Sequence, residues 1–294
     1  MMEQIKIGTC IPGHSAERWL PHFVKEDFET FSLNWHMDLL GADLKQLAEK
    51  VKPILEGTGK EITTIGLYCN PIEKEDHKKN LEYVMECAPL FGAKNVATFA
   101  GGLSGESVDA CMPKFKEVFS DLANKAAAKG LNLVIETCPM GGRWNKVTCN
   151  IGFHPRAWDM MFNEVPAENF GLEWEPAHQM RQFMDPMPLL RRYGKKILHL
   201  HGKDLTIDHA LIAEEGINGP SPYLWDRFPG QGDCDWRKIF TQLHMNGYEG
   251  DICIEGYHDP IYANDWEMTG QLASLNYLKW ARCGDFTPNP WEKK

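Results

Sequence analysis

Apolar residues recur along the chain in short runs, and eight of these runs have the length and composition of buried strands. Runs of about four to eight apolar residues bounded by turn-forming residues are typical of strands covered on both faces. The predicted strands are residues 5–10, 32–36, 62–69, 95–101, 131–138, 170–175, 196–203 and 251–257.

Between most of these runs, apolar residues return every three or four positions, which is the spacing of an amphipathic helix. The clearest case is the segment 112–130, which carries an apolar stripe and ends on Lys-Gly, a usual helix end. Helices are predicted at 44–57, 80–93, 112–130, 154–165, 188–195, 235–247 and 264–284.

Strands that alternate with helices in this way predict an α/β fold, the (β/α)8 TIM barrel, as a single domain over residues 1–294. A doubly wound open sheet is the alternative, but the early GTCIPGH segment matches a Gly-rich phosphate loop poorly. The long loop 204–234 is rich in Gly and Pro. We expect it to form part of an active-site wall and not a domain boundary.

Composition narrows the classes of partner. The 31 Lys and Arg side chains against 41 Asp and Glu give a net charge of −10, which argues against a nucleic-acid partner. No stretch reaches the roughly 18–20 apolar residues of a membrane helix, and the amino terminus does not resemble a signal peptide. The nine cysteines lack CxxC spacing. Reduced thiols in a cytoplasmic protein are therefore expected, and a homo-oligomer is compatible with the sequence.

Carboxylates and an imidazole occupy the ends of the last four predicted strands. In a (β/α)8 barrel the active site lies at the carboxyl ends of the strands. Because side chains alternate along a strand, four inward residues are predicted to meet at one rim: Glu136, Glu175, His201 and Glu255. On the seventh strand the same alternation places Leu198 and Leu200 on the face opposite to His199 and His201.

Three carboxylates and an imidazole in a confined site cannot all stay charged without a counter-charge. A single divalent cation would supply it, and ligands of mainly oxygen with one nitrogen suit Mn²⁺ first, with Mg²⁺, Co²⁺ or Zn²⁺ as alternatives. For any one glutamate the alternative interpretation is an ordinary polar residue paired with a nearby Lys or Arg.

Four further residues are candidates beside this cluster. His178 follows Glu175 on the turn that leaves the strand, where it could reach a bound substrate, and Lys203 shares the phase of His201. Arg227 and Arg143, on Gly-containing loops, are candidates for substrate binding, with loop anchoring as the alternative.

Several strand endings together resemble the sugar phosphate isomerase/epimerase family of xylose isomerase-like barrels. The similar segments are IETCP (135–139), LEWEPAH (172–178), HLHGKD (199–204), RFPGQGDCDW (227–236) and IEGYHDP (254–260). The resemblance runs over essentially the whole chain and is densest from 131 to 260. It implies that the metal is bound by the residues Glu136, Glu175, His201 and Glu255.

Two departures from the family pattern stand out. Glu175 occupies the place where many relatives have Asp, in a D-x-x-H element whose histidine falls on His178. The H-x-x-D element that begins at His201 matches the pattern, with Asp204 as its trailing acid. The second departure lies after Glu136. After Glu136 the chain reads TCPMGGRWN, where ketohexose epimerases carry a second, substrate-binding glutamate. This departure argues against the narrow assignment as a ketohexose epimerase.

The resemblance implies a divalent-metal-dependent sugar isomerase or epimerase that acts on a keto sugar or related polyol through a metal-stabilised enediolate. Glu136 and Glu255 would be its acid and base, with His178 and Lys203 assisting. The alternative is a lyase or dehydratase of a 3-keto sugar, keto-glycoside or keto-inositol that uses the same site. A non-catalytic sugar-binding protein and a phosphoesterase are further alternatives, although the phosphoesterase would need additional metal-binding histidines.

Glu173 lies one layer below Glu175 on the same face of its strand. A carboxylate buried there needs a partner, and His199 on the next strand has the matching phase. The sequence therefore predicts that Glu173 pairs with His199 beneath the site and does not bind metal itself.

Overall fold

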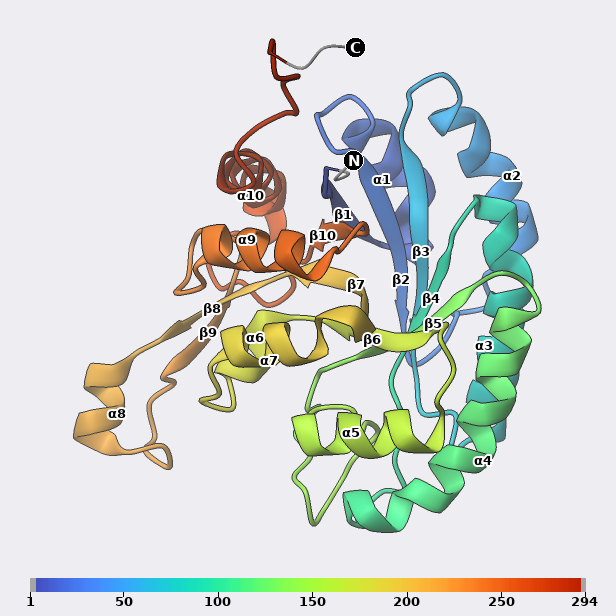
Figure 1. The fold of residues 1–294 in the computed structure, drawn as a ribbon, viewed down its shortest axis with the longest axis vertical. Coiled ribbons are helices and arrows are strands. Elements are labelled where there is room, and N and C mark those ends of the chain that lie inside the picture. The colour runs from blue at the N-terminus through green and yellow to red at the C-terminus, as the bar shows by residue number, and fades with distance from the viewer. Residues whose placement is uncertain (1–3, 292–294) are drawn as a thin grey trace.

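Eight parallel strands close into one barrel in the order β1-β10-β7-β6-β5-β4-β3-β2 (Figure 1). The computed structural model describes residues 4–291. Each predicted strand is confirmed, and the predicted (β/α)8 barrel is the observed fold. The barrel strands are β1 Lys6–Pro12, β2 Thr30–His36, β3 Glu61–Tyr68, β4 Asn95–Thr98, β5 Asn132–Glu136, β6 Phe170–Trp174, β7 Ile197–Gly202 and β10 Asp251–Ile254.

Helices cover the outside of the barrel (Figure 1). The helices are α1 Ala16–Phe23, α2 Leu44–Leu55, α3 Glu75–Cys87, α4 Val108–Ala127, α5 Pro155–Glu164, α6 Pro176–Met180, α7 Pro186–Tyr193, α8 His209–Glu215, α9 Trp236–Asn246 and α10 Glu267–Ala281. Of these, α1, α6 and α8 were not predicted. Helix α4 begins earlier than predicted because the Ser107 side chain caps it by accepting a hydrogen bond from the Ala110 N–H.

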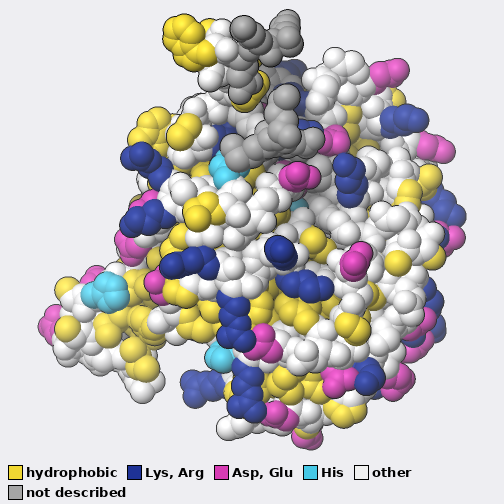
Figure 2. Space-filling model, in the orientation of Figure 1, with side chains coloured by type: hydrophobic (Ala, Val, Ile, Leu, Met, Phe, Trp, Pro, Cys, Tyr) yellow, Lys and Arg dark blue, Asp and Glu magenta, His cyan; other side chains and the backbone are white. Residues whose placement is uncertain are grey.

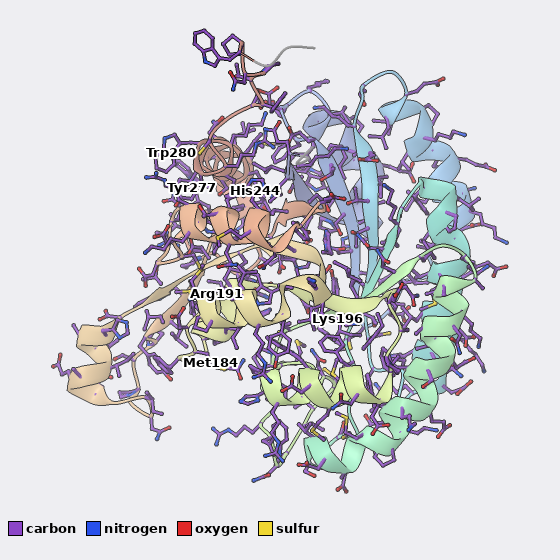
Figure 3. All side chains as sticks on the ribbon, in the orientation of Figure 1. Met184, Arg191, Lys196, His244, Tyr277 and Trp280 are labelled. Atoms are coloured by element: carbon purple, nitrogen blue, oxygen red, sulfur yellow. The ribbon has the colours of Figure 1, made fainter. Side chains whose placement is uncertain are left out.

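The main core lies between the barrel and its helices, where large aromatic side chains such as Trp158, Trp174 and Trp236 are fully buried. Neighbouring helices also contact one another. Trp280 lies on α10 (Figure 3), and the guanidinium of Arg237 on α9 lies 5.3 Å from the centre of its ring. Within residues 4–291 no helix combines the length and the apolar character needed to cross a bilayer. All nine cysteines fall in this range, and none forms a disulfide.

A β-bulge shifts the register between β6 and β7. Leu172 pairs with Ile197, whereas Glu173 pairs with His199, so Leu198 is an extra residue on β7. Leu198 packs inside the barrel against a small apolar cluster that includes Val134, while Ile197 joins the outer core. The prediction that Leu198 faces away from His199 and His201 was wrong, because strict alternation of side chains holds only where the pairing of two strands has no bulge.

The segment predicted as a loop at 204–234 contains regular structure. Strand β8 (Asp204–Ile207) pairs in antiparallel fashion with β9 (Leu224–Arg227), and α8 lies between them. This arm protrudes from the barrel, and hydrophobic side chains gather where it leaves the body (Figures 1 and 2). Its predicted role as an active-site wall holds only at its base, where Asp226 lines the central cavity.

Two buried carboxylates anchor the loops that follow β9 and β10. Asp204 accepts hydrogen bonds from the Gly230 N–H at 3.0 Å and the Cys234 N–H at 2.8 Å. Asp259 accepts hydrogen bonds from the Phe228 N–H at 3.0 Å and the Tyr262 N–H at 2.8 Å. These bonds hold the loops above the barrel mouth in place and so shape the site.

Replacing Asp259 by Asn is expected to destabilise the fold by about 2–3 kcal/mol at neutral pH, since several N–H donors lose a charged acceptor. Burial would raise the pKa of Asp259, but hydrogen bonds from Tyr262, Ile261, Phe228 and Arg227 lower it below its usual 3.8. A depressed folded pKa stabilises the fold above the unfolded value and ceases to do so as the pH falls through the folded value.

Urea unfolding at several pH values measures the effect of this substitution. Because the pKa of Asp259 is lowered in the folded state, the difference in free energy of unfolding between the wild type and Asp259→Asn should shrink below about pH 4. Asp265→Asn, an exposed change near the same loop, is the matched control and should stay within about 0.5 kcal/mol of the wild type. A difference for Asp259→Asn that stays constant down to about pH 3 would contradict the assignment.

Candidate functional site

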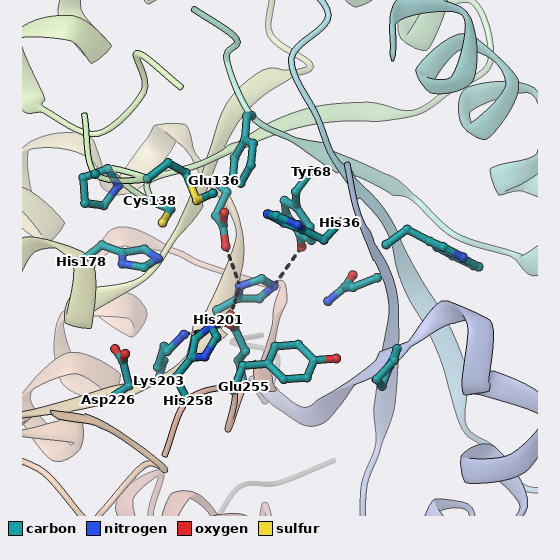
Figure 4. Close-up of a pocket in the computed structure, with 18 of the residues that line it drawn as sticks. His36, Tyr68, Glu136, Cys138, His178, His201, Lys203, Asp226, Glu255 and His258 are labelled. Carbon is teal, nitrogen blue, oxygen red and sulfur yellow. Dashed lines mark hydrogen bonds and ion pairs between the residues drawn. The ribbon is translucent and has the colours of Figure 1, made fainter. Parts of the chain in front are cut away.

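A cavity of about 690 Å³ opens at the carboxyl ends of the barrel strands (Figure 4). Polar side chains from three strand ends form its floor, namely Glu136, His201 and Glu255. This is the end of the barrel at which the sequence predicted the site.

Four predicted ligands meet at this floor. Glu136 is the last residue of β5, Glu175 directly follows β6, His201 lies in β7 and Glu255 directly follows β10. Each offers one ligand atom, and all four atoms lie within 4.8 Å of one another. The Glu175 side chain, longer than the Asp of the family pattern implied by the resemblance, therefore still reaches the cluster.

His201 presents one ring nitrogen to the carboxylates and the other to the layer below. Its Nε2 lies 3.2 Å from Glu173 Oε1. Its Nδ1 lies 2.8 Å from Glu255 Oε2, and 3.7 Å from both Glu136 Oε1 and Glu175 Oε2. The ring orientation therefore leaves Nδ1 facing the three carboxylates.

The buried ligand atoms lack hydrogen-bond partners. Both oxygens of Glu175, Oε2 of Glu255 and Nδ1 of His201 make no hydrogen bond within residues 4–291. The short contact between Nδ1 and Glu255 Oε2 lacks the geometry of a hydrogen bond. Such atoms are costly to bury unless something compensates them, and a divalent cation would do so. The cluster can hold such an ion, and its three carboxylates and one imidazole suit Mn²⁺, Mg²⁺, Co²⁺ and Zn²⁺ alike.

The three carboxylates differ in their pKa values. Burial raises the pKa of Glu136 well above its usual range, and the nearby Cys138 and Glu255 add to this. Burial would also raise the pKa of Glu255, but the Lys203 ammonium outweighs it and lowers that pKa. Glu175 is likewise held well below its usual pKa by His178 and Lys203, against the effect of burial. Environments that push the pKa values of neighbouring carboxylates apart are typical of acid and base pairs.

The structure places His178 and Lys203 inside the site. His178 belongs to the short helix α6 instead of a turn, and its Nε2 lies 3.2 Å from Glu175 Oε1. Lys203 Nζ donates to Glu255 Oε1 at 2.9 Å. Both side chains are buried and line the cavity, where they can reach a bound molecule.

The two predicted substrate-binding arginines do not line the cavity. Arg227 Nε donates to Asp259 Oδ2 at 3.1 Å, so its side chain anchors the loop. Arg143 is exposed, and its backbone pairs with that of Lys146. The arginine that does line the cavity is Arg181, which donates to Asp226 at 2.6 Å.

Sequence reasoning missed several residues of the site. Tyr68 ends β3 and its hydroxyl lies 3.3 Å from His201 Nε2, so the strand-end rule could have found it had that rule been applied to the first strands. Cys138 lies beside Glu136 and His178, with ligand atoms of all three within 4.8 Å. The ion pair of Arg181 with the distant Asp226 carries no local signal in the sequence.

The predicted pair beneath the site is confirmed. His199 Nδ1 and Glu173 Oε1 lie 2.7 Å apart, and both side chains are fully buried. The other nitrogen of His199 lies 3.6 Å from Asp251 Oδ1. Glu173 thus contacts both His199 and the Nε2 of His201, and a carboxylate in this position fixes the orientation of a metal-binding histidine.

Replacing Glu173 by Gln is expected to lower the affinity for Mn²⁺ by about 10–100-fold, because His201 loses the carboxylate that orients it. Glu173→Ala should in addition lower the free energy of unfolding by about 3–5 kcal/mol, since the buried histidines lose their counter-charge. Calorimetric titration with Mn²⁺ and urea unfolding measure the two effects. Glu168→Gln, an exposed change just before β6, is the control. Unchanged Mn²⁺ affinity in Glu173→Gln would show that Glu173 does not support His201.

Known proteins resemble this chain in sequence and in structure. A family model described as "Xylose isomerase-like TIM barrel" matches residues 23–279. The uncharacterised protein YfiH of Bacillus subtilis is 26% identical over 243 residues, which cover 72% of this chain and 77% of YfiH.

Two further relatives carry named activities. An inosose dehydratase of Geobacillus thermodenitrificans is 28% identical over 166 residues, 55% of this chain and 52% of the dehydratase. The solved structure of 3-keto-D-glucoside 4-epimerase, YcjR, from E. coli superposes with a TM-score of 0.70 at 19% sequence identity. The superposition covers 94% of this chain and 100% of the epimerase chain. The structural likeness supports the fold.

Proposed function

Since the chain belongs to the xylose isomerase-like TIM barrel family, we propose that it is a divalent-metal-dependent isomerase or epimerase of a keto sugar or related polyol. The observation that carries this proposal is the cluster of Glu136, Glu175, His201 and Glu255, whose ligand atoms lie within 4.8 Å of one another. Three of these residues, Glu136, His201 and Glu255, line the floor of a cavity large enough for a sugar, about 690 Å³. Mn²⁺ is the ion we expect, as a hard cation suited to carboxylate ligands.

A divalent cation held by this cluster would polarise the substrate carbonyl and so acidify the neighbouring C–H group. Glu255, whose pKa is lowered by Lys203, would accept that proton. Glu136, whose pKa is raised by burial, would return a proton to the resulting enediolate. Return to the opposite face of the same carbon gives an epimer, and return to the neighbouring carbon gives an isomer.

His178 and Lys203 would orient the substrate oxygens. Burial would lower the pKa of Lys203, but Glu255, Glu175 and Asp226 around it raise that pKa, so the ammonium remains a charged donor. The Lys203 ammonium also donates to Glu255 and lowers its pKa, so the side chain that would orient the substrate also keeps the base ionised.

A lyase or dehydratase is the second candidate, and the sequence match to an inosose dehydratase favours it. The first step is the same removal of a proton beside the carbonyl. The enediolate then expels a hydroxyl from the next carbon, and protonation of that hydroxyl releases water. The same acid and base residues serve both reactions.

A substrate screen in D₂O tests the proposal. Mn²⁺-loaded protein is incubated with a panel of keto sugars and keto-inositols, and deuterium is followed by NMR. Deuterium at the carbon beside the carbonyl is the expected result, whereas turnover without deuterium uptake would rule out the enediolate. Release of water or of another substituent would select the lyase. Sugar binding with neither exchange nor turnover would favour a non-catalytic sugar-binding protein.

A further inference from the structure

A second group of ligand-type side chains lies inside the barrel, nearer its amino-terminal end than the cluster at the floor of the cavity. His199 comes from β7, and Asp251 and Cys253 come from the neighbouring strand β10. Each offers one ligand atom, and the three atoms lie within 4.8 Å of one another. His199 and Cys253 are fully buried, and Asp251 is 4% exposed. We call these three residues the lower cluster.

His199 directs a free ring nitrogen at the lower cluster. Its Nδ1–H donates to the Glu173 carboxylate at 2.7 Å, so a neutral ring carries its lone pair on Nε2. This Nε2 lies 3.6 Å from Asp251 Oδ1, is buried, and makes no hydrogen bond within residues 4–291. An imidazole whose other nitrogen is held by a carboxylate is the arrangement typical of a metal ligand.

The spacing of the ligand atoms fits a tetrahedral zinc ion. With Zn–N and Zn–O bonds of about 2.0–2.2 Å and Zn–S bonds of about 2.3 Å, neighbouring ligand atoms lie about 3.3–3.6 Å apart. His199 Nε2 lies 3.6 Å from Asp251 Oδ1, and Cys253 Sγ lies 3.5 Å from Asp251 Oδ2. Both separations are therefore those of a zinc site.

Asp251 is held in place and lies between the lower cluster and a second cavity. Its Oδ2 accepts hydrogen bonds from Thr30 Oγ1 at 2.6 Å and from Thr63 Oγ1 at 2.7 Å, which leaves Oδ1 for an ion. Asp251 and the two threonines line a cavity of about 480 Å³ among the first residues of the barrel strands. This cavity gives an ion a route to the lower cluster from the end of the barrel opposite to the floor cluster.

We propose that the lower cluster is a second metal site, in which His199, Asp251 and Cys253 bind Zn²⁺ with a water molecule as the fourth ligand. A thiolate and an imidazole favour Zn²⁺, whereas three carboxylates suit a harder ion such as Mn²⁺. The ion joins β7 to β10, the strands that carry His201 and Glu255 to the floor cluster.

The buried thiol limits the affinity of this site. Burial and Asp251 raise the pKa of Cys253, but a coordinating zinc ion removes the thiol proton, which leaves to solvent. This proton loss costs binding energy, so we expect the lower cluster to fill when Zn²⁺ is added and not in the protein as purified.

Cobalt substitution tests the proposal. Co²⁺ bound to a thiolate gives a charge-transfer band in the near ultraviolet, which Co²⁺ bound only to carboxylates and imidazoles lacks. Metal-free protein titrated with Co²⁺ should bind about two equivalents and develop this band. Added Zn²⁺ should remove the band, because it displaces Co²⁺ from the lower cluster. A wild-type protein that binds Co²⁺ without this band would overturn the proposal.

Cysteine variants locate the sulfur ligand. Cys253→Ala should lose the band and still bind about one equivalent of Co²⁺ at the floor cluster, which also shows that this variant folds. Cys283→Ala, an exposed change, and Cys138→Ala, beside Glu136, are the controls and should keep the band. A band that persists in Cys253→Ala would place the ion on another thiol and overturn the proposal.

The outcome is separable from that of the proposed function. Glu175→Gln should lose turnover yet keep the thiolate band, because Glu175 is not a ligand of the lower ion. Added Zn²⁺ should also raise the melting temperature of Glu175→Gln, but not of the double variant with Cys253→Ala. Deuterium exchange into keto sugars without the band would support the reaction and overturn the lower site. The band without any exchange would do the reverse.

Discussion

Replacing Glu175 by Gln is expected to lower the affinity for Mn²⁺ by at least about 100-fold and to abolish turnover of any keto sugar. Glu175 is fully buried, and neither of its oxygens has a hydrogen-bond partner within residues 4–291. Its Oε2 faces His201 Nδ1 at 3.7 Å and can therefore reach an ion in the cluster, whereas Oε1 lies 3.2 Å from His178 Nε2. The neutral amide keeps the shape of the side chain and removes its negative charge.

Metal content and thermal unfolding measure this effect directly. Purified wild-type protein should contain about one equivalent of divalent metal, and added Mn²⁺ should raise its melting temperature because the ion binds only the folded state. Glu175→Gln and His201→Ala should show neither property. Glu61→Gln, a carboxylate at the opposite end of the barrel, should behave as the wild type. A metal-free wild type whose melting temperature does not respond to Mn²⁺ would overturn the proposed metal site.

The four cluster residues could be predicted because each lies within one residue of a strand end and in the inward phase. In a closed barrel the strand ends meet at one rim, so local alternation is enough to bring Glu136, Glu175, His201 and Glu255 together. The same reasoning found the buried pair of Glu173 with His199, since both lie one layer deeper.

What the sequence could not predict depends on contacts between distant segments. For Arg227 the sequence leaves substrate binding and loop anchoring open, and only the fold brings it to Asp259, which accepts its hydrogen bond. Nothing near Arg181 in the sequence indicates its partner Asp226 on β9. The face of Leu198 depends on a bulge that only the pairing of β6 with β7 creates.

Three ring side chains that line the cavity, Tyr68, Phe99 and His36, could be predicted only in part. Tyr68 ends β3 as Glu136 ends β5, so strand phase indicates that it faces the site. Phe99 lies just beyond β4, where phase is lost, and its ring contacts with Tyr68 and His36 follow from the closed barrel. Aromatic residues also serve in the core, so residue type alone does not separate the two roles.

Replacing Glu136 or Glu255 by Gln is expected to reduce turnover by about 10²–10⁴-fold, because each change removes one proton-transfer group. The two variants should differ in exchange. Without the base Glu255, no proton leaves the substrate, so Glu255→Gln should show neither product nor deuterium uptake. Without the donor Glu136, proton removal by Glu255 continues and the same group can return a deuteron. Glu136→Gln should therefore label the unreacted substrate while forming little product.

Because both residues are also predicted ligands, this comparison must be made at Mn²⁺ concentrations that saturate each variant, with occupancy measured in the same samples. Loss of the ion would abolish exchange in both variants alike, whereas loss of a proton-transfer group abolishes it in one. The distinction has a structural basis in the opposite pKa shifts, raised by burial at Glu136 and lowered by Lys203 at Glu255. Wild-type exchange in Glu255→Gln would reject Glu255 as the base. If the substrate is labelled in Glu255→Gln but not in Glu136→Gln, then Glu136 is the base and Glu255 is the proton donor.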